Sequence, residues 1–377
     1  MRIAFYYPWV YPYLVDLAEA LKHRGEQVTV YSTGIFGNYP HMKKLEKCIR
    51  RIPSIRFLDE TIVHPRLFLE VLRNKPNFLV IWNTESLPSL LLYVTAKARS
   101  IPTLLLVEKN KDTRYLLPLH IRILSTVKRL SVKLIHKNAT ALLAESEAAK
   151  DYLLQMRCHA DRIHVYVHGV DVERFQQKRK NLRFAQEIGI SERDLEKVVV
   201  LHLGGFNAHK GVEDLANALL NNDFDDNIFI MLKYGSLLQH YESPLQQRKN
   251  VRLIPQITQE DMPELYSLAD IVIHPSIITA GGAPVADNVL LEAMACGKAI
   301  IATDVGANSF IISDCGILIP ERDAEAIAQA TIKLSSDNEL RERYAKMARQ
   351  RAEEVLSMEK YADKILELYE AITRGRN

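Results

Sequence analysis

The sequence predicts an α/β protein with two doubly wound parallel sheets, one in each half of the chain. Short apolar runs alternate with segments of helical period, which is the pattern of parallel strands covered by helices on both faces. This pattern stops in a polar stretch at residues 176–194 and then begins again, so the two sheets should join near residue 180. A length of 377 residues leaves room for two or three domains.

The first half contains apolar runs such as RIAFY, FLVIW and TLLLV, which predict strands buried on both faces. Strands are expected at residues 2–6, 27–31, 78–82, 103–107, 141–144 and 163–167. Helices are expected at residues 12–24, 65–74, 86–99, 115–137 and 146–156. The first helix stops before Gly25, because glycine is a common signal at a helix C-terminus.

The second half repeats this alternation. Strands are expected at residues 197–203, 227–232, 251–254, 271–274 and 299–302, and helices at 211–220, 260–268, 288–295 and 323–335. Residues 337–373 have helical character throughout, with a break near Leu356 and Ser357. The final segment carries an apolar stripe at Tyr361, Ile365, Leu368 and Ile372, which must be buried against another element.

Composition places the chain among ordinary globular proteins, because 47% of its residues are hydrophobic and 25% are charged. Its four cysteines form no C-x-x-C pair, and no targeting segment or membrane-spanning stretch is recognisable, so a cytoplasmic protein is expected. The net charge of 49 − 46 = +3 conceals an asymmetry. Residues 1–178 carry 27 − 16 = +11, and residues 179–377 carry 22 − 30 = −8.

Two common kinds of nucleotide site are excluded because the sequence lacks their motifs. The first strand is followed by YPWVYP, which lacks the glycines that a dinucleotide-binding turn requires, and no phosphate-binding G-x4-G-K-[ST] sequence occurs. His164 and His168 are four residues apart, but they fall on a strand and its exit, so a metal-ligand pair is not favoured.

One candidate site lies between the predicted strand 197–203 and the following helix. The loop Gly204–Gly211 brings glycines, which allow close backbone approach, to a helix N-terminus, which favours an anion. Lys210 adds a positive charge that suits a diphosphate, although a surface lysine on a strand–helix turn remains the alternative.

A second candidate segment follows the predicted strand 271–274. The loop after it contains Gly281 and Gly282 and leads into the helix 288–295, whose first N–H groups form another anion site. Glu292 lies one turn inside this helix. It is either a surface glutamate or a carboxylate that accepts two hydrogen bonds from a ribose diol.

The segment Leu290–Gly306, LLEAMACGKAIIATDVG, resembles the signature of family 4 glycosyltransferases. Three further segments, His168–Phe175, Gly204–Gly211 and Met262–Ser276, are similar to the same family. The resemblance implies the GT-B fold, with an acceptor-binding domain at 1–178 and a nucleotide-sugar donor-binding domain at 179–356. It also implies that the C-terminal helix, 357–377, packs back on the first domain.

The resemblance further implies a retaining transfer of a sugar from a UDP- or GDP-sugar, without a metal, to a glycan or lipid-linked acceptor in polysaccharide or glycolipid synthesis. Lys210 takes the position of the diphosphate-binding lysine and Glu292 that of the ribose-binding glutamate. The N–H groups of Asn288 and Val289 would meet the distal phosphate. The remaining donor-binding candidates are Gly204, Gly205, Gly281 and Gly282.

The chain departs from the family pattern at three positions. Pro284 stands where the first glutamate of the paired-glutamate motif is usual, and Asp287 is a candidate for the missing acid. Gly205 stands where an arginine is usual, and Lys233 is a candidate to compensate for the lost charge. The histidine expected after the fourth strand is also replaced, and the candidate acceptor residues there are Glu108, Lys109, Asp112 and Arg114.

A basic stretch without acidic residues runs from Thr113 to Ala144. Its cations include Arg122, Lys128, Arg129, Lys133 and Lys137. A solvated helix face and a surface for anionic lipids both remain open interpretations. Nucleic acid is not favoured, since no aromatic residues alternate with the charges.

Three functional readings therefore stand beside one another. The first is an active glycosyltransferase. The second, prompted by Pro284 and Gly205, is a degenerate member that acts as a binding or assembly subunit. The third is an epimerase-like enzyme on the same fold, which would form product without an acceptor.

Overall fold

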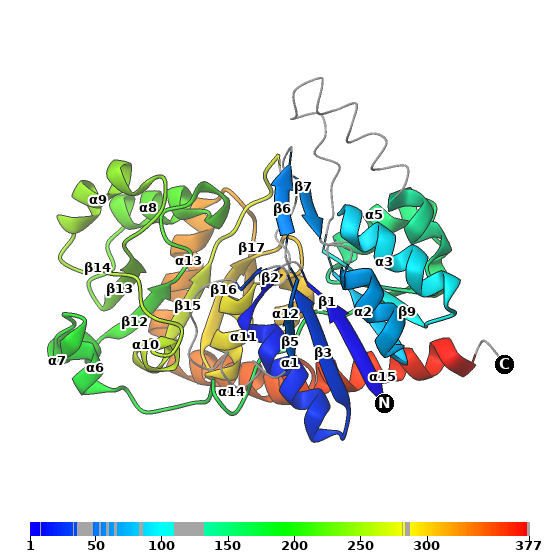
Figure 1. Ribbon diagram of the computed structural model, residues 1–377. Coiled ribbons are helices and arrows are strands. Elements are labelled where there is room, and N and C mark those ends of the chain that lie inside the picture. Colours follow the sequence, from blue (N-terminus) through cyan, green and yellow to red (C-terminus); the bar gives the residue numbers. More distant parts are fainter. Residues whose placement is uncertain are drawn as a thin grey trace. The chain divides into compact units, whose positions relative to one another are not determined.

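In the computed structural model the chain folds into two compact units (Figure 1). The structure describes residues 1–7, 9–32, 34–35, 48–52, 54–57, 60–63, 66–82, 86–108, 132–280, 282 and 287–374. The first unit consists of Met1–Gly169, Ala280–Val285 and Met358–Asn377, and the second of Val170–Thr279 and Ala286–Ser357.

The first unit is built on a parallel sheet of seven strands in the order β11-β10-β9-β8-β1-β3-β5. Its strands are β1 (Arg2–Tyr6), β3 (Gln27–Ser32), β5 (Ile49–Arg51), β8 (Phe78–Ile81), β9 (Thr103–Val107), β10 (Ala141–Ala144) and β11 (Ile163–Val165). Two small sheets accompany it, formed by β2 (Trp9–Val10) with β4 (Gly34–Ile35) and by β6 (Ser54–Phe57) with β7 (Glu60–Val63).

Helices cover both faces of this sheet. One face packs against α1 (Pro12–His23) and α15 (Met358–Arg374), and the other against α2 (Arg66–Asn74), α3 (Leu87–Ala98), the helical residues 132–138 and α5 (Glu147–Gln155). The rest of the helix expected at 115–137 lies outside the described residues.

The C-terminal helix α15 lies against α1 within the first unit, as its red ribbon shows beside the dark blue α1 in Figure 1. The apolar stripe that the sequence singled out is buried there, in one core with residues of α1 and β1. Arg24, which follows α1, pairs with Glu359 and, at 2.6 Å, with Asp363. The stripe therefore closes one face of the first sheet, with ion pairs at its edge.

The second unit holds a parallel sheet of six strands in the order β14-β13-β12-β15-β16-β17. The strands are β12 (Val198–His202), β13 (Asn227–Leu232), β14 (Val251–Ile254), β15 (Ile271–His274), β16 (Ala299–Thr303) and β17 (Ile317–Ile319). Its helices are α6 (Leu182–Glu187), α7 (Glu192–Leu195), α8 (Val212–Asn221), α9 (Leu238–Gln246), α10 (Met262–Leu268), α11 (Asn288–Ala295), α12 (Asn308–Ile312), α13 (Ala324–Ser336) and α14 (Asn338–Glu354).

The predicted fold class, two doubly wound parallel sheets, is confirmed. Two short helices, α6 and α7, were not expected, because the polar stretch that contains them shows little apolar periodicity. Both begin at side-chain caps: Asn181 accepts from the Phe184 N–H, and Ser191 and Asp194 form a capping box. Helix α9 was missed as well, and Pro244 lies inside it.

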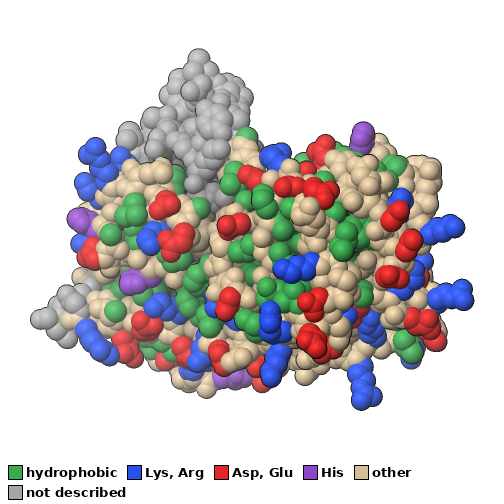
Figure 2. Space-filling view, turned by 180° about the vertical axis from the view of Figure 1, so that it is seen from behind, with side chains coloured by type: hydrophobic (Ala, Val, Ile, Leu, Met, Phe, Trp, Pro, Cys, Tyr) green, Lys and Arg blue, Asp and Glu red, His purple; other side chains and the backbone are tan. Residues whose placement is uncertain are grey.

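No helix in the described part of the chain is both long and apolar enough to cross a bilayer. Basic and acidic side chains are interspersed over the face drawn in Figure 2.

Candidate functional site

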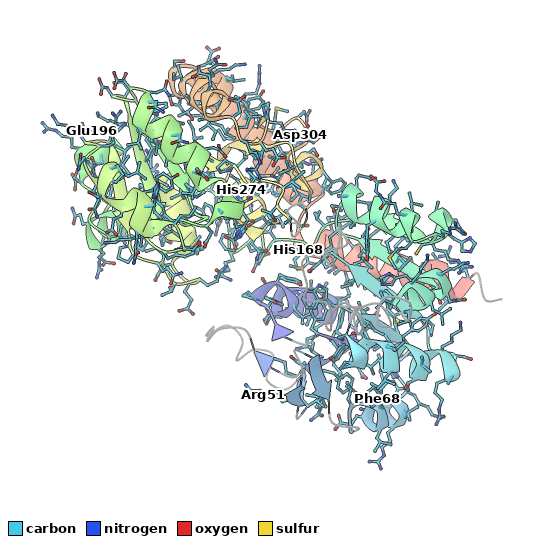
Figure 3. The ribbon with its side chains drawn as sticks, turned by 90° about the horizontal axis from the view of Figure 1, so that it is seen from above. Arg51, Phe68, His168, Glu196, His274 and Asp304 are labelled. Carbon is cyan, nitrogen blue, oxygen red and sulfur yellow. The ribbon has the colours of Figure 1, made fainter. Side chains whose placement is uncertain are left out.

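The candidate site lies in the second unit, at the edge where the parallel strands end. Strands β12 and β15 are hydrogen-bonded neighbours and finish at His202 and His274. Figure 3 labels His274. The loop Gly204–Gly211 leaves β12, and the segment after β15 leads to α11, so both predicted anion sites belong to one edge of the sheet.

Lys210 and Asp287 form an ion pair at this edge. Asp287 is the N-cap of α11, where one carboxylate oxygen accepts from the Val289 N–H at 3.1 Å. The other oxygen, Oδ2, contacts Lys210 and lies 3.3 Å from His274 Nε2. Burial alone would raise the pKa of Asp287, but the Lys210 ammonium group and the Val289 N–H together hold it well below its usual range. Asp287 is therefore a carboxylate at neutral pH.

The two strand-end histidines are buried and neutral at pH 7. Burial lowers the pKa of both His202 and His274 to about 4, despite the carboxylate of Asp287 near them. His274 Nε2 also lies 2.9 Å from Ser276 Oγ, so the imidazole connects the end of β15 to the cap of α11. His274 positions the carboxylate and His202 lies against the Ile273 and Gly205 carbonyls, and neither adds a positive charge.

Gly205 explains why the loop lacks the arginine usual in the resembling family. Its φ is +58°, and a Cβ at this position would lie 2.6 Å from the ring of Tyr234. The Tyr234 hydroxyl donates to the Leu203 carbonyl at 3.1 Å, which fixes the ring against the loop. The space next to residue 205 is thus filled by an aromatic ring from the end of β13.

Glu292 is buried, with 6% of its surface exposed, so its interpretation as a surface glutamate is wrong. Its two oxygens accept from Gln259 Nε2 and the Tyr266 hydroxyl, each at 3.0 Å. Burial raises the pKa of Glu292 to about 7, even though these two hydrogen bonds favour the carboxylate.

The structure brings together most of the predicted donor-site residues. Those at the same sheet edge are Gly204, Gly205, Lys210, Asp287, Asn288 and Val289. Gly282 is described with φ +121°, whereas Gly281 and Pro284 lie outside the described residues. Lys233 follows β13 and pairs with Glu242 at 2.5 Å.

His202, His274 and Tyr234 were missed as parts of this site. The available signal was positional: each stands at or just after the carboxyl end of a predicted strand. His274 contacts Asp287 13 positions away, His202 the Ile273 carbonyl 71 positions away and Tyr234 the Leu203 carbonyl 31 positions away. Sequence spacing does not reveal such contacts.

In the first unit, Glu108 follows β9 and accepts from the Trp82 indole N–H. Burial, and then the nearby carboxylate of Glu145, raise the pKa of Glu108 to about 8. Glu145 and His168, which sequence reasoning did not assign to a site, lie near it. Lys109, Asp112 and Arg114 lie outside the described residues. Within the described part of the chain, no group of three or more His, Cys, Asp or Glu side chains could hold a metal ion.

Comparisons with known proteins agree with this architecture. Residues 184–351 match the family described as glycosyl transferases group 1, and residues 12–174 match glycosyltransferase family 4. An Anabaena HepE structure in complex with UDP and glucose has a TM-score of 0.73 at 17% identity, covering 98% of this chain and 100% of that one. Sucrose-phosphate synthase from Thermosynechococcus elongatus has a TM-score of 0.72 at 18% identity, and the match covers all of both chains.

Fold and site thus define a protein of the GT-B class, as the sequence predicted. The chain belongs to the group 1 glycosyltransferases of family 4. Among curated relatives, α-maltose-1-phosphate synthase of Mycolicibacterium smegmatis is 27% identical over 62% of this chain and 64% of its own length. An uncharacterized glycosyltransferase of Methanocaldococcus jannaschii is 26% identical over 64% of this chain. The matched part spans 60% of that relative's length.

Proposed function

We propose that this protein is a retaining glycosyltransferase, which moves a sugar from a UDP- or GDP-sugar to a glycan or lipid-linked acceptor. The observation that carries the proposal is the position of Lys210 at the N-terminus of α11. There a lysine charge and the Val289 N–H at the start of α11 meet at one anionic group, the carboxylate of Asp287.

In this proposal the diphosphate of the donor lies against Lys210 and the N–H groups of Asn288 and Val289. Glycosyl transfer breaks the bond between the sugar and the distal phosphate, so negative charge grows on the leaving diphosphate. A lysine held in place before the reaction stabilises that charge without reorganisation. Asp287 holds Lys210 in this position. We propose that it replaces the acid missing at Pro284 in this way, through its contact with Lys210 and not through contact with the donor.

Glu292 is proposed to serve the ribose of the donor. Its carboxyl group already accepts two hydrogen bonds, so the ribose hydroxyls would use the remaining lone pairs or replace Gln259. The glycines 204, 205, 281 and 282 are proposed to let the backbone approach the donor. No metal is required in this scheme, since the charge on the diphosphate is met by Lys210 and backbone N–H groups.

The first unit is proposed to bind the acceptor, with Glu108, Lys109, Asp112 and Arg114 as the residues involved. The second unit, with the boundaries 179–356 expected from the sequence, is the proposed donor domain. The four cysteines are free thiols, which supports the cytoplasm as the compartment.

Two measurements test the proposal. A thermal-shift panel of UDP, GDP and ADP with their sugars identifies the donor, since a ligand at 100 times its Kd should add about 2.7 kcal/mol of stability. Transfer assays with the identified donor then separate an enzyme from a degenerate binding subunit, which would bind the nucleotide without turnover. Product formed in the absence of any acceptor would favour the epimerase-like alternative.

We also propose that the basic stretch binds an anionic membrane surface. Arg122, Lys128 and Arg129 lie outside the described residues, but Lys137 is exposed and its neighbour Leu134 is 65% exposed. An exposed leucine beside a lysine suits the boundary between lipid headgroups and acyl chains. Sedimentation with anionic but not neutral vesicles at low salt, lost when Arg122, Lys128, Arg129, Lys133 and Lys137 are changed to Gln, is the expected result. Binding that ignores lipid charge would contradict it.

A further inference from the structure

Aromatic and acidic side chains gather at the carboxyl ends of four neighbouring strands of the first sheet. Tyr7 follows β1, Trp82 follows β8, Glu108 follows β9 and Glu145 follows β10. These strands are consecutive neighbours in the sheet, so the four residues come from one continuous edge. We call these residues, with Tyr11, Tyr13 and His168, the edge cluster.

Contacts within the edge cluster run from one carboxylate to the other. Trp82 donates to Glu108 and stacks on Tyr7, with ring centroids 5.4 Å apart. Tyr7 meets Tyr13 edge to face at 6.3 Å. Tyr13 stacks on His168 at 4.6 Å, and His168 Nδ1 lies 3.8 Å from Glu145 Oε2. Tyr11 packs on both Trp82 and Tyr13.

The floor of the edge cluster is buried and holds unpaired polar atoms. Glu145 is 1% exposed, and within the described residues its Oε1 atom has no hydrogen-bond partner. The hydroxyl of Tyr361, from α15, is equally buried and also lacks a partner there. Tyr11, Tyr13, Trp82 and Glu108 are half-buried around this floor. Buried polar atoms are normally paired, so these two atoms call for a partner that is not part of the described chain.

The electrostatics of the edge cluster favour a cation. Neither Glu108 nor Glu145 has a lysine or arginine partner in the described part of the chain. Glu145 and Glu108 both raise the pKa of Tyr7, Tyr13 and Tyr361, in each case after the larger effect of burial, so the carboxylates and these rings share one volume. Aromatic faces attract cations, as carboxylates do. Burying two carboxyl groups side by side without a positively charged partner costs free energy.

We infer that the edge cluster binds a protonated amino group of the acceptor, so that the acceptor is an amino sugar or a similar polyol amine. The inference rests on the proposed function, because it names the chemical class of the acceptor. Glu145 and Glu108 would hold the ammonium group, and Tyr7, Tyr11, Tyr13 and Trp82 would cover the ring that carries it.

The shared environment of the two carboxyl groups predicts a second observable, the release of a proton when an ammonium group binds. The groups facing them are His168 from the segment after β11, Tyr7 after β1, Tyr11 and Tyr13 at the start of α1, Trp82 after β8 and Tyr361 from α15. Because the pKa of Glu108 is raised to about 8, this carboxyl group holds a proton at pH 7. An arriving ammonium group should displace that proton, whereas a neutral ligand should not.

The test uses the full chain and three pairs of sugars: glucosamine, galactosamine and mannosamine, each with its N-acetyl counterpart. Binding is measured at pH 7 by ligand-observed NMR and by calorimetry in two buffers of different ionisation enthalpy. We expect at least one amine to bind ten-fold or more tightly than its N-acetyl partner, with release of a proton. If no amine exceeds its partner, or if the preferred amine binds without proton release, the inference is overturned.

Glu145→Gln supplies the matched variant, with Glu147→Gln as its control, because Glu147 is an exposed residue that pairs with Lys150. We expect the first change to abolish the amine preference and the second to leave it intact. Should Glu145→Gln fail to fold, the comparison of amines with N-acetyl sugars on the unaltered chain still decides the question. UDP or GDP binding measured on the same samples keeps the two proposals apart. Nucleotide binding without amine preference refutes only this inference, and amine preference without nucleotide binding refutes only the donor assignment.

Discussion

The ammonium group of Lys210 contacts the carboxylate of Asp287, 77 positions further along the chain. The same carboxylate accepts from the Val289 N–H, so one negative group receives both the lysine and the first turn of α11. The lysine and the helix N-terminus thus form an anion-binding arrangement that holds a carboxylate of the protein itself. A donor phosphate must share these donors with Asp287 or displace it.

Lys210→Ala should weaken binding of UDP or GDP about 10- to 100-fold, because a charge-assisted contact contributes about 1.5–3 kcal/mol. Calorimetry measures the affinity. Lys197→Ala is a suitable control, because Lys197 precedes β12 and lies at the opposite end of that strand. Equal affinities for Lys210→Ala and the unaltered chain would remove Lys210 from the donor site.

Asp287→Asn should tighten nucleoside diphosphate binding several-fold. Asparagine still caps α11, as a good N-cap residue, but the negative charge that competes with the phosphates is gone. The affinity for UDP or GDP, compared at low and high salt, measures the change. Weaker binding in this variant would show that the hold of Asp287 on Lys210 matters more for affinity than its competition with the phosphates.

Glu292→Gln should change how stability depends on pH. The folded pKa of Glu292, about 7, lies above its ordinary value of 4.5, so the folded chain binds more protons between these values. This residue's contribution therefore falls as pH rises from about 4.5 to 7, by an amount on the order of 3 kcal/mol. The variant should lose that slope.

Glu108 also has a raised pKa, so the quantity to compare is the difference between the two unfolding curves, measured by denaturant titration at several pH values. Parallel pH profiles for the variant and the unaltered chain would mean that Glu292 is ionised in the fold throughout this range.

Gly205→Ala should destabilise the protein by more than about 1 kcal/mol, because φ +58° disfavours any side chain and the new Cβ would meet the Tyr234 ring. Thermal unfolding measures the loss. The double change with Tyr234→Ala should recover the part that comes from the clash. A fully stable single variant would show that Tyr234 moves aside easily, and the missing arginine would then need another explanation.

Ile365→Ala should destabilise the first unit by about 2–5 kcal/mol, as expected for a large aliphatic side chain removed from a core. Glu367→Ala on the same helix is the control, since that side chain is 67% exposed and its pair with Lys364 contributes little. Equal stability of the two variants would mean that α15 adds little to the first core.

Much of the fold could be predicted from the sequence because parallel strands buried on both faces appear as short, continuous apolar runs. The runs RIAFY, TLLLV and NIFIML became β1, β9 and β13 with the predicted bounds. Elements held by caps gave no such signal: α7 depends on the capping box of Ser191 and Asp194 and on the ion pair between Asp194 and Arg252. A cap or an ion pair needs only one or two side chains, so it produces no hydrophobic period in the sequence.

For the candidate sites, the sequence by itself determined the residue types and the edge of the sheet. Lys210 could be named from its place in a strand–helix loop, and Glu292 from its place one turn inside a predicted helix, whereas Asp287 was named only through the family resemblance. Parallel strands bring the ends of such loops to one edge. Only the tertiary structure decided their partners: Asp287 with Lys210 and His274, Glu292 with Gln259 and Tyr266, and Tyr234 against Gly205. The same holds for Glu108 and Glu145, which are 37 residues apart and share an environment because β9 and β10 are neighbours. Charge state follows from burial and from neighbours in space, and neither is a property of the local sequence.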